Sequence, residues 1–553
     1  MRIVIIGSVA AGTSVAAKAR RNDETAEIVV YEAAQDISYS VCGMPYFLGG
    51  EVPSVEELIP RDANWFKKRF EIDIHTNQQV VAIQPQEKAL TIHDKLTGED
   101  TQDSYDKLVI ATGSYSLTPR PFDQSTSDNV FHVKTMENTR KIDQFMQENE
   151  IKNVTIVGSG FIGLEMAEQL TEKGIQVTIV ELADQIFPKI DPDMSYHLAE
   201  TLRNNHVDFY LNDKVELIEG KDNITQLKTA KGEVIDTDMV ILAVGVRPNV
   251  SLAEAAGITL GETGAIKVNP FMQTSEKDIY AVGDVAESYH LITGKPVYHP
   301  LGSTANKMGR VAGDHITGGA LSFKGTLGTG IFRLFDLTVA YTGLSYNEAQ
   351  TQGYDPVVIH NIKPTHATYL GGENLLIKGV ADRETGRVLG AQIVGPEGVD
   401  KRIDVLATAI SFNANAEDLF HLDLAYAPPF STTKDPVHYT GMVLENARQH
   451  LPVMTPETVI ELQKAQQPLQ VVDVRSSSAF EKGHVTNAVN MPMPSLRKEL
   501  DKLDKRLPTV VYCNKGVTSN TAQNLLLNSG FKEVYVLSGG NTHYQNYQKS
   551  LIK

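Results

Sequence analysis

Cysteine is almost missing from this chain. The 553 residues include only Cys42 and Cys513, which lie far apart in the sequence. They cannot form a disulfide framework or a C-x-x-C redox pair. Such cysteine usage is typical of a reducing compartment, so we expect a cytoplasmic protein.

Long apolar runs and an excess of positive charge are missing too. No run approaches the roughly 18 apolar residues of a transmembrane helix. The apolar stretch at the N-terminus is too short for a signal peptide. The net charge is −17, from 51 lysines and arginines against 68 aspartates and glutamates. This charge argues against nucleic acid or an anionic membrane as the main partner. We expect a small-molecule partner, no nucleic acid, no membrane and no metal.

A strand, a glycine turn, a helix and a second strand open the chain. Apolar residues 3–6 precede Gly7 and Gly12, and the next apolar run ends at Glu32. Glycines in such a turn let the backbone approach a pyrophosphate, and the acid binds ribose hydroxyls. Val9 occupies the middle glycine position of G-x-G-x-x-G, so a turn without a ligand is the alternative.

A second copy of the pattern is complete. Residues 154–157 lead into Gly158, Gly160 and Gly163, and the following strand ends at Glu181. A carboxylate at that position hydrogen-bonds an unmodified ribose and repels a 2′-phosphate. We therefore expect NADH to be preferred over NADPH, although NADPH remains an alternative.

Three more apolar strands end at small or acidic residues, within residues 105–113, 240–249 and 279–284. Each is a weak signal alone, but their order along the chain is informative. Their candidate cofactor residues are Ala111, Thr112, Gly113, Gly245, Gly283 and Asp284.

The order of these five elements resembles the flavin-dependent pyridine nucleotide-disulfide oxidoreductases over residues 1 to about 445. The resemblance implies FAD at the first glycine turn and a nicotinamide nucleotide at the second. It places Asp284 on the flavin ribityl chain and adds Val9, Ala10 and Ala305 to the cofactor residues. The implied fold class is α/β, with two Rossmann-like dinucleotide-binding domains and an α+β dimerisation domain.

Cys42 is the candidate redox centre. A thiol at a turn that leads into a helix can have its pKa lowered by backbone N–H groups and the helix dipole; the alternative is a small buried apolar side chain. Residues 38–43 resemble the S-F-x-x-C-G motif of single-cysteine members, with Tyr39 in place of Phe. Oxidases and peroxidases of this family place a His where Ala10 stands, and Pro45-Tyr46 resembles the CoA-disulfide reductases.

The same branch implies further site residues. Tyr426, in an A-Y-A-P-P segment, and Tyr369 resemble tyrosines that reach the active-site cysteine of the partner subunit, so we expect a homodimer or larger homo-oligomer. Packing aromatics are the alternative. The implied CoA contacts, whose default interpretation is a solvated surface, are Ser14, Lys18, Arg21, Ser38 and Lys434.

The last hundred residues resemble a single rhodanese domain of the α/β class. Cys513 ends an apolar strand at a loop that opens a helix, which favours a thiolate or persulfide. Thr518 stands where many such loops carry an Arg, which weakens a thiosulfate-binding interpretation. A scaffold domain with an inert Cys is the alternative.

The expected domains are an FAD-binding domain of residues 1–113 and 245–324, an NAD(P)H-binding domain of 114–244, a dimerisation domain of 325–447, a linker of 448–457 and a rhodanese-like domain of 458–553. The predicted enzyme is an NAD(P)H-dependent flavoprotein that reduces CoA disulfide, CoA persulfide or polysulfide. Three alternatives are an oxygen-reducing NADH oxidase, a sulfurtransferase served by its reductase half, and a non-enzymatic redox-sensing or partner-binding module.

Overall fold

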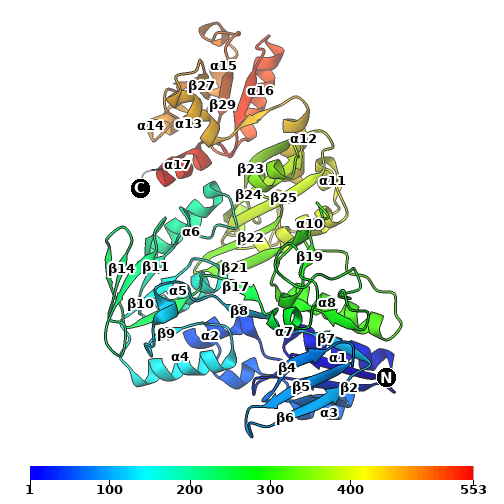
Figure 1. Cartoon of the computed structure of the whole chain (residues 1–553). Coiled ribbons are helices and arrows are strands. Elements are labelled where there is room, and N and C mark those ends of the chain that lie inside the picture. Colours follow the sequence, from blue (N-terminus) through cyan, green and yellow to red (C-terminus); the bar gives the residue numbers. More distant parts are fainter. Residues whose placement is uncertain (552–553) are drawn as a thin grey trace. The chain divides into compact units, whose positions relative to one another are not determined.

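The computed structural model describes residues 1–551 and comprises two compact units (Figure 1). The first unit is Met1–Asp184 with Asn205–Gly328, and the second is Gln185–Asn204 with the chain from Thr329 onward. Residues 185–204, expected within the NAD(P)H-binding domain, therefore pack in the second unit. Among the described residues, no helix is long and apolar enough to cross a membrane.

A five-stranded parallel sheet in the order β18-β7-β1-β2-β3 begins the first unit. Its central strands are almost continuously apolar and buried, as expected of a parallel sheet whose two faces are both covered. Helices α1 (Ala10–Asn22) and α8 (Gly302–Ile316) pack against each other beside it. The strands are β1 (Arg2–Ile6), β2 (Glu27–Tyr31), β3 (Ile72–His75), β7 (Lys107–Ile110) and β18 (Ile279–Ala281).

A second parallel sheet in the same unit has the order β12-β11-β10-β16-β9. Helix α5 (Phe161–Glu172) follows β10 directly. The strand–glycine turn–helix–strand pattern that occurs twice in the sequence therefore corresponds to two five-stranded parallel sheets. The strands are β9 (Val130–Phe131), β10 (Asn153–Val157), β11 (Gln176–Val180), β12 (Asp208–Tyr210) and β16 (Met239–Leu242).

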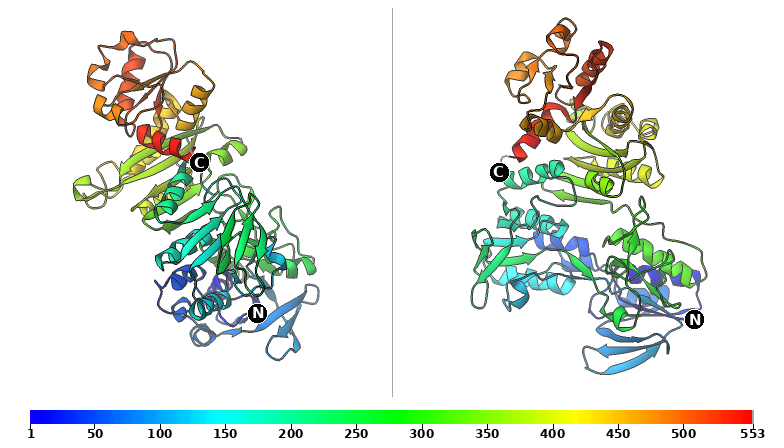
Figure 2. Two further views of the ribbon diagram at one scale, coloured as in Figure 1. Left: turned by 90° about the vertical axis from the view of Figure 1, so that its left-hand side faces the viewer. Right: turned by 45° about the horizontal axis from the view of Figure 1, so that its top comes forward.

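The second unit contains an antiparallel sheet in the order β21-β22-β25-β24-β23. Helices α10 (Val399–Ser411) and α12 (Pro436–Gln449), yellow in Figures 1 and 2, pack on it. Helix α6 (Pro192–Asn204) also contacts β25. The strands are β21 (Gly330–Leu334), β22 (Leu337–Gly343), β23 (Pro356–Pro364), β24 (Asn374–Asp382) and β25 (Val388–Gly395).

A parallel sheet in the order β26-β30-β29-β27-β28 forms the C-terminal part of that unit. Strand β26 (Val453–Met454) lies in the segment expected to be a linker and pairs with β30 (Val534–Leu537). The other strands are β27 (Gln470–Asp473), β28 (Val489–Asn490) and β29 (Thr509–Tyr512). Helices α13 (Pro456–Lys464), α16 (Val517–Asn528) and α17 (Gly540–Ser550) complete an α/β module, as predicted.

Smaller elements complete both units. The small sheets join β4 (Gln78–Gln84), β5 (Ala89–Asp94) and β6 (Asp100–Ser104); β13 (Val215–Glu219), β14 (Gln226–Thr229) and β15 (Val234–Asp236); β8 (Ser114–Ser116) and β17 (Val246–Pro248); and β19 (Ser288–Tyr289) and β20 (Pro296–Val297). The other α-helices are α2 (Met44–Gly49), α3 (Ala63–Phe70), α4 (Met136–Glu148), α7 (Ser251–Ala255), α9 (Tyr346–Thr351), α11 (Ala416–His421), α14 (Ser477–Glu481) and α15 (Met493–Leu496).

Candidate active site

The first glycine turn leaves no space for side chains at two positions. Gly7 has φ of +103°, and a Cβ there would lie 2.3 Å from the carbonyl oxygen of Ala111. A Cβ on Gly12 would lie 1.9 Å from the carbonyl oxygen of Gly7. At the end of β2, the Glu32 carboxylate accepts hydrogen bonds of 2.8 Å from both the backbone N–H and the hydroxyl of Ser8. The turn therefore has the close approach and the acid that a dinucleotide site needs.

The second turn repeats this geometry. Gly158 has φ of +101°, and a Cβ on Gly163 would lie 2.1 Å from the carbonyl oxygen of Gly158. A Cβ on Gly160 would meet nothing closer than 4.0 Å, so its backbone faces open space. The Glu181 carboxylate accepts hydrogen bonds of 2.7 Å from the N–H and the hydroxyl of Ser159. Both turns fit a nucleotide pyrophosphate above a helix N-terminus.

The carboxyl ends of β7 and β18 bring further predicted residues beside the first turn. A Cβ on Gly283 would lie 2.9 Å from the Cβ of Ala11 and 3.6 Å from that of Ala305. The next residue, Asp284, accepts a hydrogen bond of 2.9 Å from the Ser114 hydroxyl. Parallel strands end at one edge of their sheet, which explains why these distant segments meet.

Three other predicted residues lie in the segments after β7 and before β17. The Thr112 hydroxyl donates to the backbone carbonyl of Asn249 at 2.9 Å, which links the turn after β7 to the segment after β17. Gly113 and Gly245 have φ of +67° and +98°, and a Cβ on either would meet nothing within 4 Å. The backbone conformation therefore requires glycine at both positions, and the space beside each of them is open.

Cys42 lies in a short 3₁₀ turn, Val41–Gly43, immediately before α2. Its side chain is exposed to solvent. Withdrawal of hydration by the surrounding protein raises the pKa of Cys42, the carboxylates of Glu165 and Asp284 raise it further, and Lys134 lowers it. The expected lowering by the helix is wrong for the chain alone, because burial and two carboxylates together outweigh one ammonium, and α2 has only six residues.

Replacement of Glu165 by glutamine is expected to speed alkylation of Cys42. Loss of the carboxylate removes a negative charge that disfavours the thiolate, and one unit of pKa changes the thiolate fraction about ten-fold below the pKa. The measurement is the rate of iodoacetamide modification in a Cys513→Ala background, where Cys42 is the single thiol. The matched control is Glu172→Gln, an exposed residue on the same helix. An equal rate in both variants would contradict this electrostatic account.

A cavity of about 560 Å³ opens beside the start of α1. It brings together four of the residues expected to contact CoA: Ser14, Lys18, Arg21 and Ser38. Val9 and Ala10 also line it, as do three arginines, Arg61, Arg69 and Arg310. The cavity therefore combines guanidinium and ammonium groups with polar hydroxyls, as an anionic phosphate-bearing ligand requires.

Aromatic and charged neighbours orient the cavity's cations. The Arg61 and Arg69 guanidinium carbons lie 5.0 and 5.5 Å from the Trp65 ring centre. Lys18 pairs with Asp314 at 3.0 Å, so part of its charge is already neutralised. The arginines therefore offer the freer positive charge, which agrees with their preference for phosphate groups.

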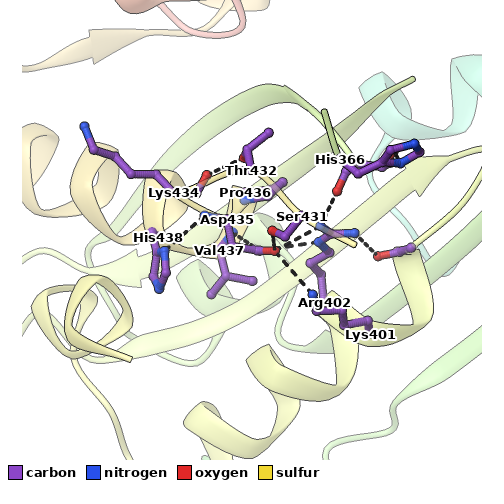
Figure 3. Close-up of polar contacts among 12 residues, drawn as sticks. His366, Lys401, Arg402, Ser431, Thr432, Lys434, Asp435, Pro436, Val437 and His438 are labelled. Carbon is purple, nitrogen blue, oxygen red and sulfur yellow. Dashed lines mark hydrogen bonds and ion pairs between the residues drawn. The ribbon is translucent and has the colours of Figure 1, made fainter. Parts of the chain in front are cut away.

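The second unit carries the other predicted residues. Tyr369 and Tyr426 are 77% and 51% exposed, unlike packing aromatics of a core. The segment that follows Tyr426 is fixed by Asp435, which accepts hydrogen bonds from Arg402 at 2.9 Å and from Ser431 at 2.7 Å (Figure 3). The Lys434 side chain points away from this network in Figure 3.

Cys513 follows β29 at the start of the loop that leads into α16. It is buried, and the Gly516 N–H donates to its sulfur at 3.2 Å. Burial acts to raise the pKa of Cys513, but hydrogen bonds from the Ser519 side chain and from the N–H groups of Ser519, Lys515 and Gly516 lower it overall. The predicted anion-binding loop is therefore formed around a thiol that favours the thiolate.

Comparison with known proteins agrees with this arrangement. The family model described as pyridine nucleotide-disulphide oxidoreductase matches residues 1–303, and its dimerisation-domain model matches residues 331–436. A rhodanese-like domain model matches residues 455–547.

Individual relatives extend over most of the chain. An NAD(P)H sulfur oxidoreductase (CoA-dependent) of Pyrococcus furiosus is 38% identical over 80% of this chain and 99% of its own length. The crystal structure of reduced Bacillus anthracis CoADR-RHD is similar at 35% identity and a TM-score of 0.96, over 99% of this chain and 98% of that one. An NAD-dependent persulfide reductase from A. fulgidus is similar at 36% identity and a TM-score of 0.90, over 98% and 100%.

Proposed function

Because the chain belongs to the pyridine nucleotide-disulphide oxidoreductase family, we propose that it is an FAD-dependent NAD(P)H oxidoreductase that reduces CoA disulfide, CoA persulfide or polysulfide. The names of the sulfur oxidoreductase, the CoADR-RHD and the persulfide reductase support this class of substrate. The observation that carries the proposal is an exposed, solitary Cys42 in the same unit as two dinucleotide-type glycine turns and a cationic cavity.

The two glycine turns would hold the two nucleotides. Gly7, Gly12 and Glu32 would bind the pyrophosphate and adenosine ribose of FAD, with Asp284 on the ribityl chain. Gly158, Gly163 and Glu181 would bind NADH in the same manner. Bound FAD would supply two-electron transfer between nicotinamide and sulfur.

Cys42 would act as the nucleophile on the substrate sulfur. Its thiolate attacks the S–S bond of CoA disulfide, so that one CoA thiolate leaves and a Cys42–CoA mixed disulfide forms. Two electrons and a proton then release the second CoA thiol and restore the Cys42 thiolate. The chain has no neighbouring cysteine to resolve the mixed disulfide. In the oxidised resting state, Cys42 would therefore either carry CoA in a mixed disulfide or be oxidised to a sulfenic acid.

Lys134 is the cation that favours the Cys42 thiolate. Its ammonium donates to the Ser114 hydroxyl at 2.8 Å and lies 3.7 Å from Asp284. These contacts hold its charge beside the candidate flavin site. Lys134 would thereby stabilise the thiolate that leaves or attacks at Cys42.

The partner subunit would complete the site in a homodimer. The match of the dimerisation-domain model supports a homo-oligomer. Tyr426 and Tyr369 of the partner subunit would protonate or position the leaving thiolate. Their exposure in the single chain is what such a role requires.

The rhodanese-like module would handle sulfane sulfur. Hydrogen bonds from the loop lower the pKa of Cys513 and would stabilise a thiolate or persulfide there. The outer sulfur of a persulfide formed there would pass to a CoA thiolate, which gives CoA persulfide for the reductase and restores the Cys513 thiolate.

Replacement of Glu181 by glutamine is expected to raise the kcat/KM for NADPH relative to NADH about ten-fold. The amide keeps a hydrogen-bond acceptor but removes the negative charge that would repel a 2′-phosphate. Steady-state kinetics with each nucleotide measure the ratio. Glu216→Gln, at an exposed position of β13, is the control. An unchanged ratio in Glu181→Gln would remove this residue from nucleotide selection.

The proposal is tested by NADH oxidation with the full chain, measured without oxygen for each sulfur substrate. CoA disulfide, CoA persulfide and polysulfide are supplied separately, and oxygen is supplied in a fourth reaction. The expected result is turnover with at least one sulfur substrate that exceeds turnover with oxygen. Rapid turnover with oxygen alone would favour an NADH oxidase instead.

A further inference from the structure

Three lysines from different segments of the second unit gather at the Cys513 loop. The Lys515 ammonium in that loop donates to the side-chain oxygen of Asn374 at 2.7 Å. Asn374 pairs across β23 and β24 with Pro364, which follows Lys363. The Lys363 ammonium lies 4.0 Å from the centre of the Tyr439 ring.

Lys434 joins this group through the same aromatic side chain. Its ammonium lies 5.9 Å from the centre of the Tyr439 ring, so Lys363 and Lys434 share one aromatic neighbour. Aromatic faces attract ammonium groups without neutralising them. Their positive charges therefore remain available to an anion.

Buried contacts hold β23 against the elements that flank Cys513. The His360 N–H donates to the Ser538 hydroxyl at 2.7 Å, and the His360 ring stacks on His543 with centres 4.1 Å apart. A Cβ on Gly539 would lie 3.2 Å from the Cβ of His360, and one on Gly540 would lie 2.5 Å from the carbonyl oxygen of Cys513. The strand that carries Lys363 is thus fixed beside the loop.

The charges of this cluster act on one another. Burial lowers the pKa of Lys363, the ammonium groups of Lys515 and Lys434 lower it further, and Cys513 raises it. An anion placed among the three lysines would relieve their mutual repulsion. The loop itself carries the uncharged Thr518 where an Arg is common, so the lysines supply a charge that the loop lacks.

We propose that Lys363, Lys434 and Lys515 bind the charged group of an anionic sulfur donor, one bearing sulfonate or phosphate oxygens, while Cys513 attacks its outer sulfur. This inference rests on the proposed sulfur-handling role of Cys513. The Cys513 thiolate bonds to the outer sulfur, the S–S bond of the donor breaks, and the electron pair leaves with the inner sulfur. Thiosulfate gives sulfite and CoA persulfide gives the CoA thiolate, each with a persulfide anion on Cys513.

The test follows the gain of one sulfur atom on Cys513 by mass spectrometry of the full-length protein. A Cys42→Ser background keeps the reductase from removing the sulfur. Thiosulfate and CoA persulfide are used separately over a range of concentrations. The variants are Lys363→Gln, Lys363→Arg and the control Lys464→Gln, an exposed lysine at the end of α13, with thermal unfolding to verify folding.

The half-saturating donor concentration is expected to rise roughly ten-fold in Lys363→Gln, with a similar maximal rate and a weaker salt dependence. Lys363→Arg should retain most of the affinity, and Lys464→Gln should match the parent. If the half-saturating concentration rises in Lys363→Gln for only one of the two donors, that donor is the ligand of the three lysines. If Lys363→Gln matches Lys464→Gln with both donors, the inference is wrong while the role of Cys513 stands. If the parent gains no sulfur from either donor, both the role of Cys513 and the inference fail.

Discussion

Replacement of Cys42 by serine is expected to lower turnover with CoA disulfide and CoA persulfide by at least about a thousand-fold. Serine has nearly the same size, but its hydroxyl cannot form a disulfide with the substrate. Neither the glycine turns nor Glu181 contacts the substituted atom, so reduction of bound flavin by NADH should persist. Stopped-flow absorbance of the flavin and steady-state NADH consumption separate these two steps.

The Cys42 experiment needs a thiol control in the same chain. Cys513→Ala removes the other cysteine and should leave reduction of CoA disulfide unchanged, because Cys513 has its own loop in the rhodanese-like module. Equal turnover by wild type and Cys42→Ser would exclude Cys42 from the chemistry. If only Cys513→Ala lost turnover, the reductase nucleophile would be Cys513 and the assignment to Cys42 would be wrong.

Replacement of Asp435 by alanine is expected to destabilise the second unit by about 3–5 kcal/mol. Arg402 and Asp435 are both almost fully buried, at 2% exposure each. The Arg402 guanidinium donates to Asp435 and also to the backbone carbonyl of Thr365 at 2.6 Å. Without the carboxylate, the guanidinium would remain buried and uncompensated. Chemical denaturation followed by circular dichroism measures the change in the free energy of unfolding.

The matched control is Asp404→Ala, an exposed aspartate on the same helix as Arg402, with an expected change within about 0.5 kcal/mol. Burial acts to raise the pKa of Asp435, but Arg402 and the Val437 N–H lower it overall. The carboxylate therefore contributes its full stabilisation above the unfolded pKa near 3.9 and loses it as pH falls through the folded pKa. A destabilisation equal to that of Asp404→Ala would contradict the role of this pair.

Glycine spacing allowed much of the first unit to be predicted. At Gly7 and Gly158 only a residue without a Cβ fits against the neighbouring strand, so the requirement is local and visible in the sequence. The acids Glu32 and Glu181 follow each second strand at a regular distance. Apolar strands between these positions predicted the parallel sheets.

The charged sites were less accessible to prediction. Arg61, just before α3, and Arg310, in α8, lie far apart in sequence, and both line the cavity only because the fold brings these segments together. Lys363 lies on β23, and nothing in its local sequence relates it to Cys513. The pKa of Cys42 depends first on burial by the surrounding protein and then on Glu165 and Asp284 from distant segments, which is why the expected direction from the neighbouring helix was wrong.

The central claim is that one sulfur, without a second protein thiol, exchanges electrons with a thiol metabolite. The most direct measurement is the mass of the intact full-length protein after anaerobic incubation with CoA disulfide, before and after addition of NADH. We predict one CoA attached at Cys42 before NADH and a free Cys42 thiol afterwards. Absence of a CoA adduct at Cys42, or an adduct that NADH does not remove, would contradict the account.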